Sequence, residues 1–220
     1  MLPNPEIQPL AGGLLNIVST IPGRSPAILV GAHYDTEATI PNFVGANDGA
    51  AGTAAVVELA RAIEQHLPED HREVRFVLFD GEEEPVGCPD AQFVQCALRG
   101  SKAYAQAHRG EIGQVVLLDY IANKGVRIPR EENSDPALWE ELREAASEAG
   151  TDEVFPDATQ PAVLDDHIPF IATGVPSIDL IDFRYPYADT AQDTPDKLSI
   201  DSLDAVGEAT AELIVRLSAQ

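Results

Sequence analysis

The sequence predicts an α/β domain in which helices flank a mostly parallel, mixed β-sheet. Two observations predict this fold class. Residues 27–32 and 74–79 are continuous apolar runs of strand length, as expected for strands that are buried on both faces of a sheet. Segments with helical periodicity, such as residues 53–63, separate these runs. Residues 1–220 contain no internal repeat and no low-complexity linker, so we expect a single domain.

The first half of the chain supplies further expected elements. Residues 14–18 are apolar and end near the turn residues 21–23, which indicates a strand followed by a turn. A glycine-rich turn at residues 45–52 leads into the helix at residues 53–63. One face of that helix carries Val56, Leu59, Ala60 and Ile63.

The second half continues the alternation of helices and strands. Residues 101–108 suggest a helix, and residues 114–118 form another apolar strand. A helix with a polar face is expected at residues 136–149, followed by a strand at residues 175–181. Apolar residues at helical spacing between positions 203 and 217 predict that a C-terminal helix packs against the sheet.

The composition argues against several classes of partner. The chain has 14 Lys+Arg against 37 Asp+Glu, which gives a formal net charge of −23. Such a surface repels phosphate backbones and anionic lipids, so neither nucleic acid nor a membrane is an expected partner. No apolar run is long enough to span a bilayer, and the first residues lack the pattern of a signal peptide. We expect a soluble protein; its compartment and oligomeric state stay open.

Two cysteines are too few for a disulfide scaffold. Cys88 and Cys96 lie in the long connection between residues 85 and 100, which we expect to form a surface excursion near the functional site. They form either one loop bridge or two free thiols.

Metal-binding side chains follow three of the expected strands. His33 follows the first buried strand, Glu82 and Glu83 follow the second, and Asp119 ends the third. Open α/β sheets bind ligands at the carboxyl ends of their strands, so these residues are expected to converge in one crevice. In metal-assisted hydrolysis one glutamate binds the metal while its neighbour transfers a proton.

Several neighbouring residues have both a structural and a functional interpretation. His33 is either a hydrogen-bonded polar residue or a metal ligand that Asp35 orients. Asp48 is either a helix N-cap or a ligand in the glycine-rich turn. The cluster of Asp165, Asp166 and His167 is either a helix cap with a buried histidine or part of the site. A nucleophilic serine elbow and a phosphate-binding loop are absent from the sequence.

Five ordered blocks of this sequence resemble the zinc aminopeptidases of metallopeptidase family 28, a superfamily that includes animal-type glutaminyl cyclases. The resemblance implies a three-layer sandwich with a central, mostly parallel mixed β-sheet, and a chain that is short at its N-terminus. The blocks are Gly31-Ala-His-Tyr-Asp-Thr36, Gly45-Ala-Asn-Asp-Gly49, Phe79-Asp-Gly-Glu-Glu83, Leu117-Leu-Asp119 and Asp166-His-Ile-Pro-Phe170.

The resemblance also implies roles for the site residues. Asp48 would bridge two metal ions, and His33 and Asp119 would complete one of the two sites. Glu83 would belong to the other site, and Glu82 would be the general base that activates water for attack on a peptide carbonyl.

One ligand departs from the family pattern. Where the family usually has a histidine followed by a threonine, this chain has Asp189 and Thr190. A site of Asp48, Glu83 and Asp189 offers only oxygen, which suits Mn²⁺, Mg²⁺ or Ca²⁺ better than Zn²⁺. We therefore expect one or two ions, with Zn²⁺ at the His33 site and the second site weakly held, filled by a harder ion, or empty.

Three functions follow from the resemblance. The first is a metal-dependent aminopeptidase that hydrolyses small peptide or aminoacyl substrates. The second is a glutaminyl-peptide cyclotransferase with a single zinc ion, which the doubled aspartate at Asp165 and Asp166 favours and Asp189 disfavours. The third is a non-catalytic binding protein on a degenerate fold, which the presence of Glu82 disfavours.

Overall fold

A computed structural model describes residues 1–220, apart from the side chain of Asp90. Its main sheet has the strand order β1-β2-β4-β3-β5-β8. The strands β3, β4, β5 and β8 run parallel, whereas β1 and β2 pair antiparallel at one edge. The sheet strands are β1 (Glu6–Pro9), β2 (Leu15–Ile21), β3 (Arg24–His33), β4 (Arg72–Phe79), β5 (Ile112–Asp119) and β8 (Ser177–Ile181). The predicted mixed, mostly parallel sheet is confirmed.

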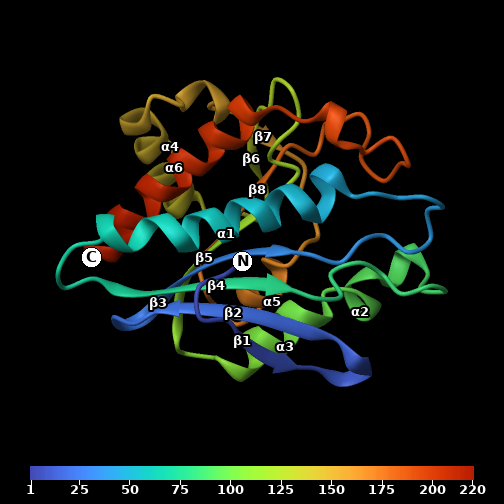
Figure 1. Ribbon diagram of the computed structural model, residues 1–220, viewed down its shortest axis with the longest axis horizontal. Coiled ribbons are helices and arrows are strands. Elements are labelled where there is room, and N and C mark those ends of the chain that lie inside the picture. Colours follow the sequence, from blue (N-terminus) through green and yellow to red (C-terminus); the bar gives the residue numbers. More distant parts are fainter.

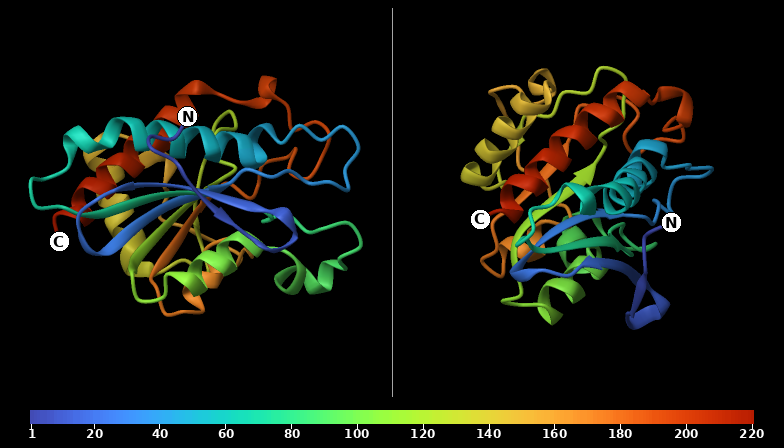
Figure 2. Two further views of the ribbon diagram at one scale, coloured as in Figure 1. Left: turned by 60° about the horizontal axis from the view of Figure 1, so that its bottom comes forward. Right: turned by 60° about the vertical axis from the view of Figure 1, so that its left-hand side comes forward.

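Helices cover both faces of this sheet and give the molecule three layers (Figure 1, Figure 2). The helices α1, α4 and α6 pack on one face, and α3 and α5 pack on the other. Helix α2 lies in the loop that follows β4 (Figure 1). The helices are α1 (Gly52–Ala62), α2 (Phe93–Cys96), α3 (Arg99–Ala107), α4 (Pro136–Ala149), α5 (Ile168–Ile171) and α6 (Ile200–Ser218).

The central strand β3 shows why its sequence is a continuous apolar run. Successive side chains of a strand point to opposite faces, and here both faces are covered. Ile28, Val30 and Ala32 pack beneath α1, α4 and α6, whereas Ala27 and Leu29 pack against α3 and α5. All five are at most 1% exposed, so no position of the run can be polar without a buried partner.

Helix α1 approaches the sheet closely because it begins with Gly52. A Cβ atom at this position would lie 2.3 Å from the carbonyl oxygen of Leu118 on β5 and 2.9 Å from the Cβ of Ala32 on β3. This contact fixes the height of the turn before α1, which carries Asp48, above the strand ends.

Sequence predicted the long elements well and the short ones poorly. The helix at 136–149 matches α4, whose Asp135 side chain caps the N–H groups of Ala137 and Leu138. Strand β1 was not predicted, since it is a short, mostly exposed edge strand without an apolar run. The pair β6 (Arg130–Glu131) and β7 (Thr159–Gln160) is too short to show any periodicity.

The remaining helical segments are single turns. They are Ala11–Gly13, Ile63–His66, Asp90–Gln92, Asp152–Val154 and Pro195–Lys197, together with the kinked turn Ala46–Ala51. Among the described residues, every helix is too short or too polar to cross a bilayer.

Candidate metal centre

A cluster of acidic residues lies at the carboxyl ends of β3, β4 and β5. A cavity of about 520 Å³ opens there, and its walls carry carboxylates from six separate segments of the chain. These carboxylates belong to Glu37, Asp48, Glu82, Glu83, Glu84, Asp119, Asp165 and Asp189. Residues that are far apart in the sequence therefore meet around one cavity, as expected for an open α/β sheet.

His33 lies at the centre of this cluster and is 2% exposed. Its Nε2 atom is 3.1 Å from Asp48 Oδ1 and 3.5 Å from Asp119 Oδ1. Burial alone would lower the pKa of His33, but the surrounding carboxylates of Asp119, Asp35 and Asp48 raise it well above its usual value. One imidazole nitrogen thus faces two carboxylates that come from different elements.

Asp35 supports this arrangement from behind. Its Oδ1 atom is 3.7 Å from His33 Nδ1, and its two oxygens accept the backbone N–H groups of Glu82 and Glu83, each at 3.2 Å. Burial opposes ionisation of Asp35, but His33 and these two N–H groups lower its pKa. Asp35 therefore joins the end of β3 to the Glu82–Glu83 turn after β4.

Asp48 sits in the kinked turn that precedes α1. Its φ and ψ of −85° and 101° are not helical, and the N-cap position of α1 is Ala51, so Asp48 is no helix cap. The following Gly49 has φ 87°, and a Cβ there would lie 2.9 Å from the carbonyl oxygen of Asp35. Only glycine fits this turn without displacing its neighbours.

A second aspartate holds this turn in place. Asp193 is fully buried, and its carboxylate accepts the N–H groups of Asn47 and Asp48 at 3.0 Å. The hydroxyl of Tyr185 donates to the same carboxylate at 2.7 Å. Asp193 thus fixes the backbone of Asp48, although it does not line the cavity itself.

Glu82 and Glu83 are adjacent, and both line the cavity. The ligand atoms of Glu83, His33 and Asp48 lie within 4.8 Å of one another, a spacing at which they could hold one metal ion. Burial, followed by the charge of Asp48, raises the pKa of Glu83 to about 9. Burial and the charge of Asp165 raise the pKa of Glu82 well above its usual value. The two glutamates therefore meet different carboxylates within one cavity.

Tyr120 connects Asp48 with Asp189. Its hydroxyl donates to Asp48 Oδ2 at 2.8 Å and to Asp189 Oδ1 at 3.2 Å, while its backbone N–H donates to Asp119 Oδ1. Burial and the charges of Asp119, Asp48 and Asp189 raise the pKa of Tyr120 far above its usual value, so its hydroxyl remains a donor. Asp189 itself has φ 50°, in the left-handed region.

The three residues of the Asp165 cluster do not share one environment. Asp165 lines the cavity, whereas Asp166 and His167 are fully buried beneath it. Asp166 accepts a hydrogen bond from the Ser101 hydroxyl on α3. His167 precedes α5 but makes no side-chain cap, and its ring faces Glu131 and Asp179.

Sequence reasoning missed Tyr120 and Asp193 as functional residues. A tyrosine directly after an apolar strand resembles a core residue, and the sequence gives no sign that its hydroxyl faces two carboxylates. Asp193 lies in the irregular stretch 182–196, where no periodicity assigns a direction to any side chain.

The residues of this centre fit a divalent cation. Glu83 Oε1 is buried without a hydrogen-bond partner, which is costly unless a proton or a cation compensates. His33, Asp48 and Asp119 combine one nitrogen with carboxylate oxygens, the donor set that zinc accepts. Asp48, Glu83 and Asp189 offer oxygens alone, which hard ions prefer.

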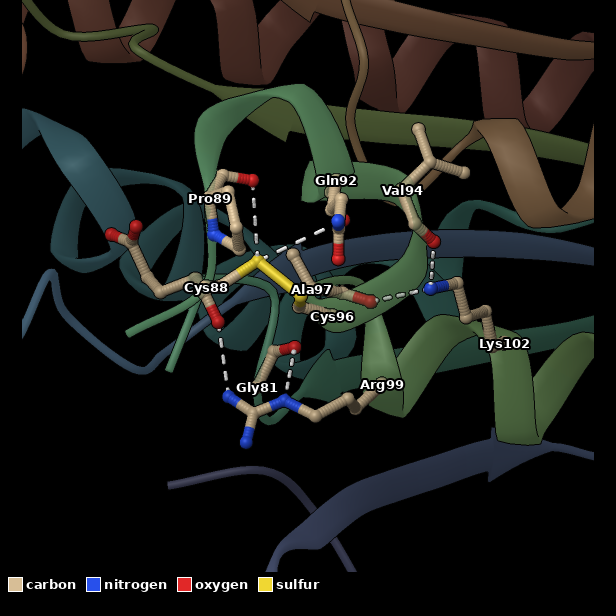
Figure 3. The surroundings of a disulfide bond; sticks show 10 residues. Gly81, Cys88, Pro89, Gln92, Val94, Cys96, Ala97, Arg99 and Lys102 are labelled. Atoms are coloured by element: carbon tan, nitrogen blue, oxygen red, sulfur yellow. Dashed lines mark hydrogen bonds between the residues drawn. A yellow bond between two sulfur atoms is a disulfide. The ribbon is translucent and has the colours of Figure 1, made fainter. Parts of the chain in front are cut away.

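The loop after the glutamates forms another wall of the cavity. Cys88 and Cys96 are joined by a disulfide, which closes this loop around α2 (Figure 3). Arg99 and Lys102 fasten the base of the loop to backbone carbonyl groups, including that of Gly81 (Figure 3). Phe93 of the loop adds to the apolar part of the cavity lining.

Relatives of this chain are enzymes of two kinds. It is 27% identical to a glutaminyl-peptide cyclotransferase of Boiga irregularis, in an alignment that covers 88% of this chain and 62% of that protein. It is 26% identical to aminopeptidase YwaD of Bacillus subtilis, with 82% and 39% covered. A solved glutaminyl cyclase of an Acidobacteriales bacterium superposes with a TM-score of 0.84 at 30% identity, covering 98% of this chain and 78% of that one.

The solved cyclase therefore shares this fold, and the chain spans 62% of the length of the Boiga protein. The sequence profile described as peptidase family M28 matches residues 16–214, nearly the whole chain. The chain belongs to peptidase family M28.

Proposed function

We propose that this protein is a metal-dependent aminopeptidase-type hydrolase, which removes the first residue of small peptides. The observation that carries the proposal is the position of Asp48 between two donor sets. One of its oxygens lies 3.1 Å from His33, and the other accepts the Tyr120 hydroxyl that also reaches Asp189. When bound, divalent ions at these two sets would polarise the scissile carbonyl and lower the pKa of water.

In this proposal Glu82 moves the proton. Glu82 lines the cavity and is 8% exposed, whereas its neighbour Glu83 is the glutamate whose ligand atom lies close to those of His33 and Asp48. Burial and the charge of Asp165 raise the pKa of Glu82 well above the usual value. A carboxylate of raised pKa can take a proton from water and pass it to the leaving amine near neutral pH.

The acidic wall of the cavity suits a substrate with a free amino group. Glu37, Glu84 and Asp165 line the cavity together with the proposed ligands. Their negative field, added to the net charge of −23, attracts the ammonium group of a peptide N-terminus. The same field disfavours peptides with an acidic first residue.

The donor chemistry favours hydrolysis over cyclisation. The nitrogen-containing set of His33, Asp48 and Asp119 balances the charge of Zn²⁺ better than the three carboxylates of Asp48, Glu83 and Asp189. The family resemblance places the cyclases' single zinc ion on the second of these sets. A zinc ion at the His33 set, joined by a harder ion at the second, is therefore the arrangement we propose.

Cyclisation of an N-terminal glutamine is the second candidate, because Asp165 adds its charge to Glu82 in the same cavity. In that reaction the α-amine attacks the side-chain amide and ammonia leaves, so a proton must travel from one nitrogen to the other. A pair of buried carboxyl groups suits that transfer. The glutaminyl cyclases among the relatives also favour it.

A single assay series separates the two reactions. The metal-depleted protein is supplied with Zn²⁺, Mn²⁺ or Mg²⁺, alone and in pairs, and is offered aminoacyl-p-nitroanilides and a peptide that begins with glutamine. Release of the first residue supports the aminopeptidase proposal. Release of ammonia together with loss of the peptide's free α-amino group supports the cyclase. If neither product forms with any metal and Glu82→Gln behaves like the wild type, the protein is a binding member of the fold.

A further inference from the structure

One wall of the cavity has no regular secondary structure of its own. Residues Ala162, Val163, Leu164 and Asp165 line the cavity between β7 and α5. Asp165 is the carboxylate of this wall, and under the proposed function it faces the substrate amine beside Glu82. A segment without helix or strand hydrogen bonds needs other contacts to hold a buried carboxylate in place.

Glu131 holds the part of this segment that precedes Asp165 in the sequence. It belongs to β6, is fully buried and does not line the cavity. Its Oε2 atom accepts the N–H of Val163 at 3.2 Å and the N–H of Asn133 at 2.8 Å. The side-chain amide of Asn133 in turn donates to the carbonyl oxygen of Val163 at 2.8 Å. Both backbone polar groups of Val163 are thereby held by the turn that follows Glu131.

The second oxygen of Glu131 reaches the chain after Asp165. Glu131 Oε1 lies 3.4 Å from Nε2 of His167, and Nδ1 of the same ring lies 3.8 Å from Asp179 Oδ2 on β8. Glu131, His167 and Asp179 are all fully buried. One carboxylate therefore contacts the segment on both sides of Asp165, two residues before it and two residues after it.

The two carboxyl groups beside the His167 ring differ in their pKa values. Burial opposes ionisation of Glu131, but the nearby His167 and Ser134 side chains and the hydrogen bond from the Asn133 N–H lower its pKa to about 2. Burial and the charge of Asp165 raise the pKa of Asp179 well above its usual value. The pKa of Glu131 is thus lowered and that of Asp179 is raised, although both carboxyl groups are buried beside the same imidazole.

We propose that Glu131 is a positioning residue that fixes Asp165 in the cavity through Val163 and His167, although it never reaches the substrate. The inference rests on the proposed function only for the role of Asp165 in substrate binding. The clamp on residues 163–167 is a property of the fold and can be measured without any substrate.

Hydrogen exchange tests the clamp directly. Glu131→Gln keeps an acceptor for Val163 but removes the charge that faces His167, and Glu131→Ala removes both contacts. We expect amide exchange of residues 163–167 to rise about tenfold in Glu131→Gln and more in Glu131→Ala. Glu132→Gln is the matched control, because its exposed neighbouring side chain should leave the exchange unchanged. Unchanged exchange in a folded Glu131→Gln protein overturns the proposal.

Kinetics test whether the clamp acts through Asp165. We expect KM to rise about tenfold in Glu131→Gln while kcat changes less than about threefold, because a binding contact is weakened. Asp165→Asn should raise KM as well, and the double variant should be no worse than Asp165→Asn alone. Additive losses in the double variant would show that Glu131 has only a general structural role, and would overturn the proposal.

Two further outcomes are distinguishable. If the wild type acts on neither substrate class, the proposed function fails, and the exchange experiment alone decides on the clamp. Asp165, His167 and Asp179 also offer ligand atoms within 4.8 Å of one another. A metal equivalent that survives in Asp48→Asn but is lost in Asp179→Asn would overturn the proposal, because an ion would then hold this wall.

Discussion

The hydroxyl of Tyr120 donates a hydrogen bond to the carboxylate of Asp48 at 2.8 Å. The same hydroxyl also reaches Asp189, and the backbone N–H of Tyr120 contacts Asp119. A single residue after β5 therefore contacts three of the five proposed metal ligands. Such contacts around metal ligands set the orientation of each donor atom and hence the affinity for the ion.

Tyr120→Phe is expected to weaken metal binding without unfolding the protein. The ring can still pack against Tyr185 and Phe183, but the contact to Asp48 and Asp189 is lost. We expect affinity for the second ion to fall about 10–100-fold, measured by competition with a chromophoric chelator. Tyr187→Phe is the control, since its ring contacts with Tyr185 and Lys197 do not need the hydroxyl. Equal affinities in all three proteins would contradict the role of Tyr120.

Substitution of Glu82 should lower activity, whereas substitution of Glu83 should lower the metal content. Glu82→Gln is expected to lower kcat about 10²–10⁴-fold while the metal content is retained, because the variant lacks the proton carrier. Glu83→Gln should lose metal from the second site. Elemental analysis of both purified variants, combined with their initial rates, checks the assignment. Loss of metal from Glu82→Gln would exchange the two roles.

The metal preference should change with position 189. We expect wild-type protein to retain about one equivalent of Zn²⁺ after dialysis, with Mn²⁺ or Mg²⁺ bound more weakly at the all-oxygen site. Asp189→His should raise the retained zinc towards two equivalents, because it adds a nitrogen donor. Histidine tolerates the left-handed backbone found at this position. Two full equivalents of zinc in the wild type would refute the proposed difference between the sites.

Long-range features of the fold were more predictable than local ones. Each central strand is buried on both faces, so its sequence is apolar throughout, and the polar residue after it marks the strand end. That rule alone brought His33, Glu82, Glu83 and Asp119 to one edge. The resemblance to a known family added Asp189, which follows no regular element.

The hydrogen bonds that hold the site residues in place could not be predicted from the sequence pattern. Asp193 accepts the N–H of Asp48 from 145 positions away, and Glu131 accepts that of Val163 from 32 positions away. Neither residue lies in a periodic segment, and each has a common alternative role as a solvated surface carboxylate. The bridge between Cys88 and Cys96 was likewise left open, because a sequence does not give the distance between two side chains.

Glu131 should also make stability depend on pH. Its pKa is about 2 in the folded protein against 4.5 ordinarily, so folding favours the ionised form. That contribution is complete above about pH 4.5, amounts to about 3 kcal/mol, and is lost as the pH falls towards 2. Urea unfolding should therefore show that the free energy of unfolding differs between wild type and Glu131→Gln at pH 7, and that this difference becomes smaller below pH 4.5. A difference in unfolding free energy that does not change with pH would show that folding does not lower the pKa of Glu131.

The disulfide is expected to stabilise the loop that carries Phe93. A disulfide between cysteines with a sequence separation of 8 lowers the conformational entropy of the unfolded chain, which stabilises the folded protein by about 2–3 kcal/mol. The double variant Cys88→Ser/Cys96→Ser should unfold at lower temperature, and its KM should rise because Phe93 is less well held. Thermal scans with and without reductant check this, and the double variant should not respond to reductant. A wild-type protein that is equally indifferent would contradict a stabilising bridge.

Asp189 and Asp193, which both lie between β8 and α6, contact the site in different ways. Asp193 orients Asp48 through the backbone, while Asp189 offers its own side chain four positions earlier. Asp48, the proposed bridging ligand, thus has an anchor other than Asp189, the proposed ligand that would select the ion. Under the proposed function, one substitution at position 189 would change the preferred metal while Asp193 keeps the turn of Asp48 in place.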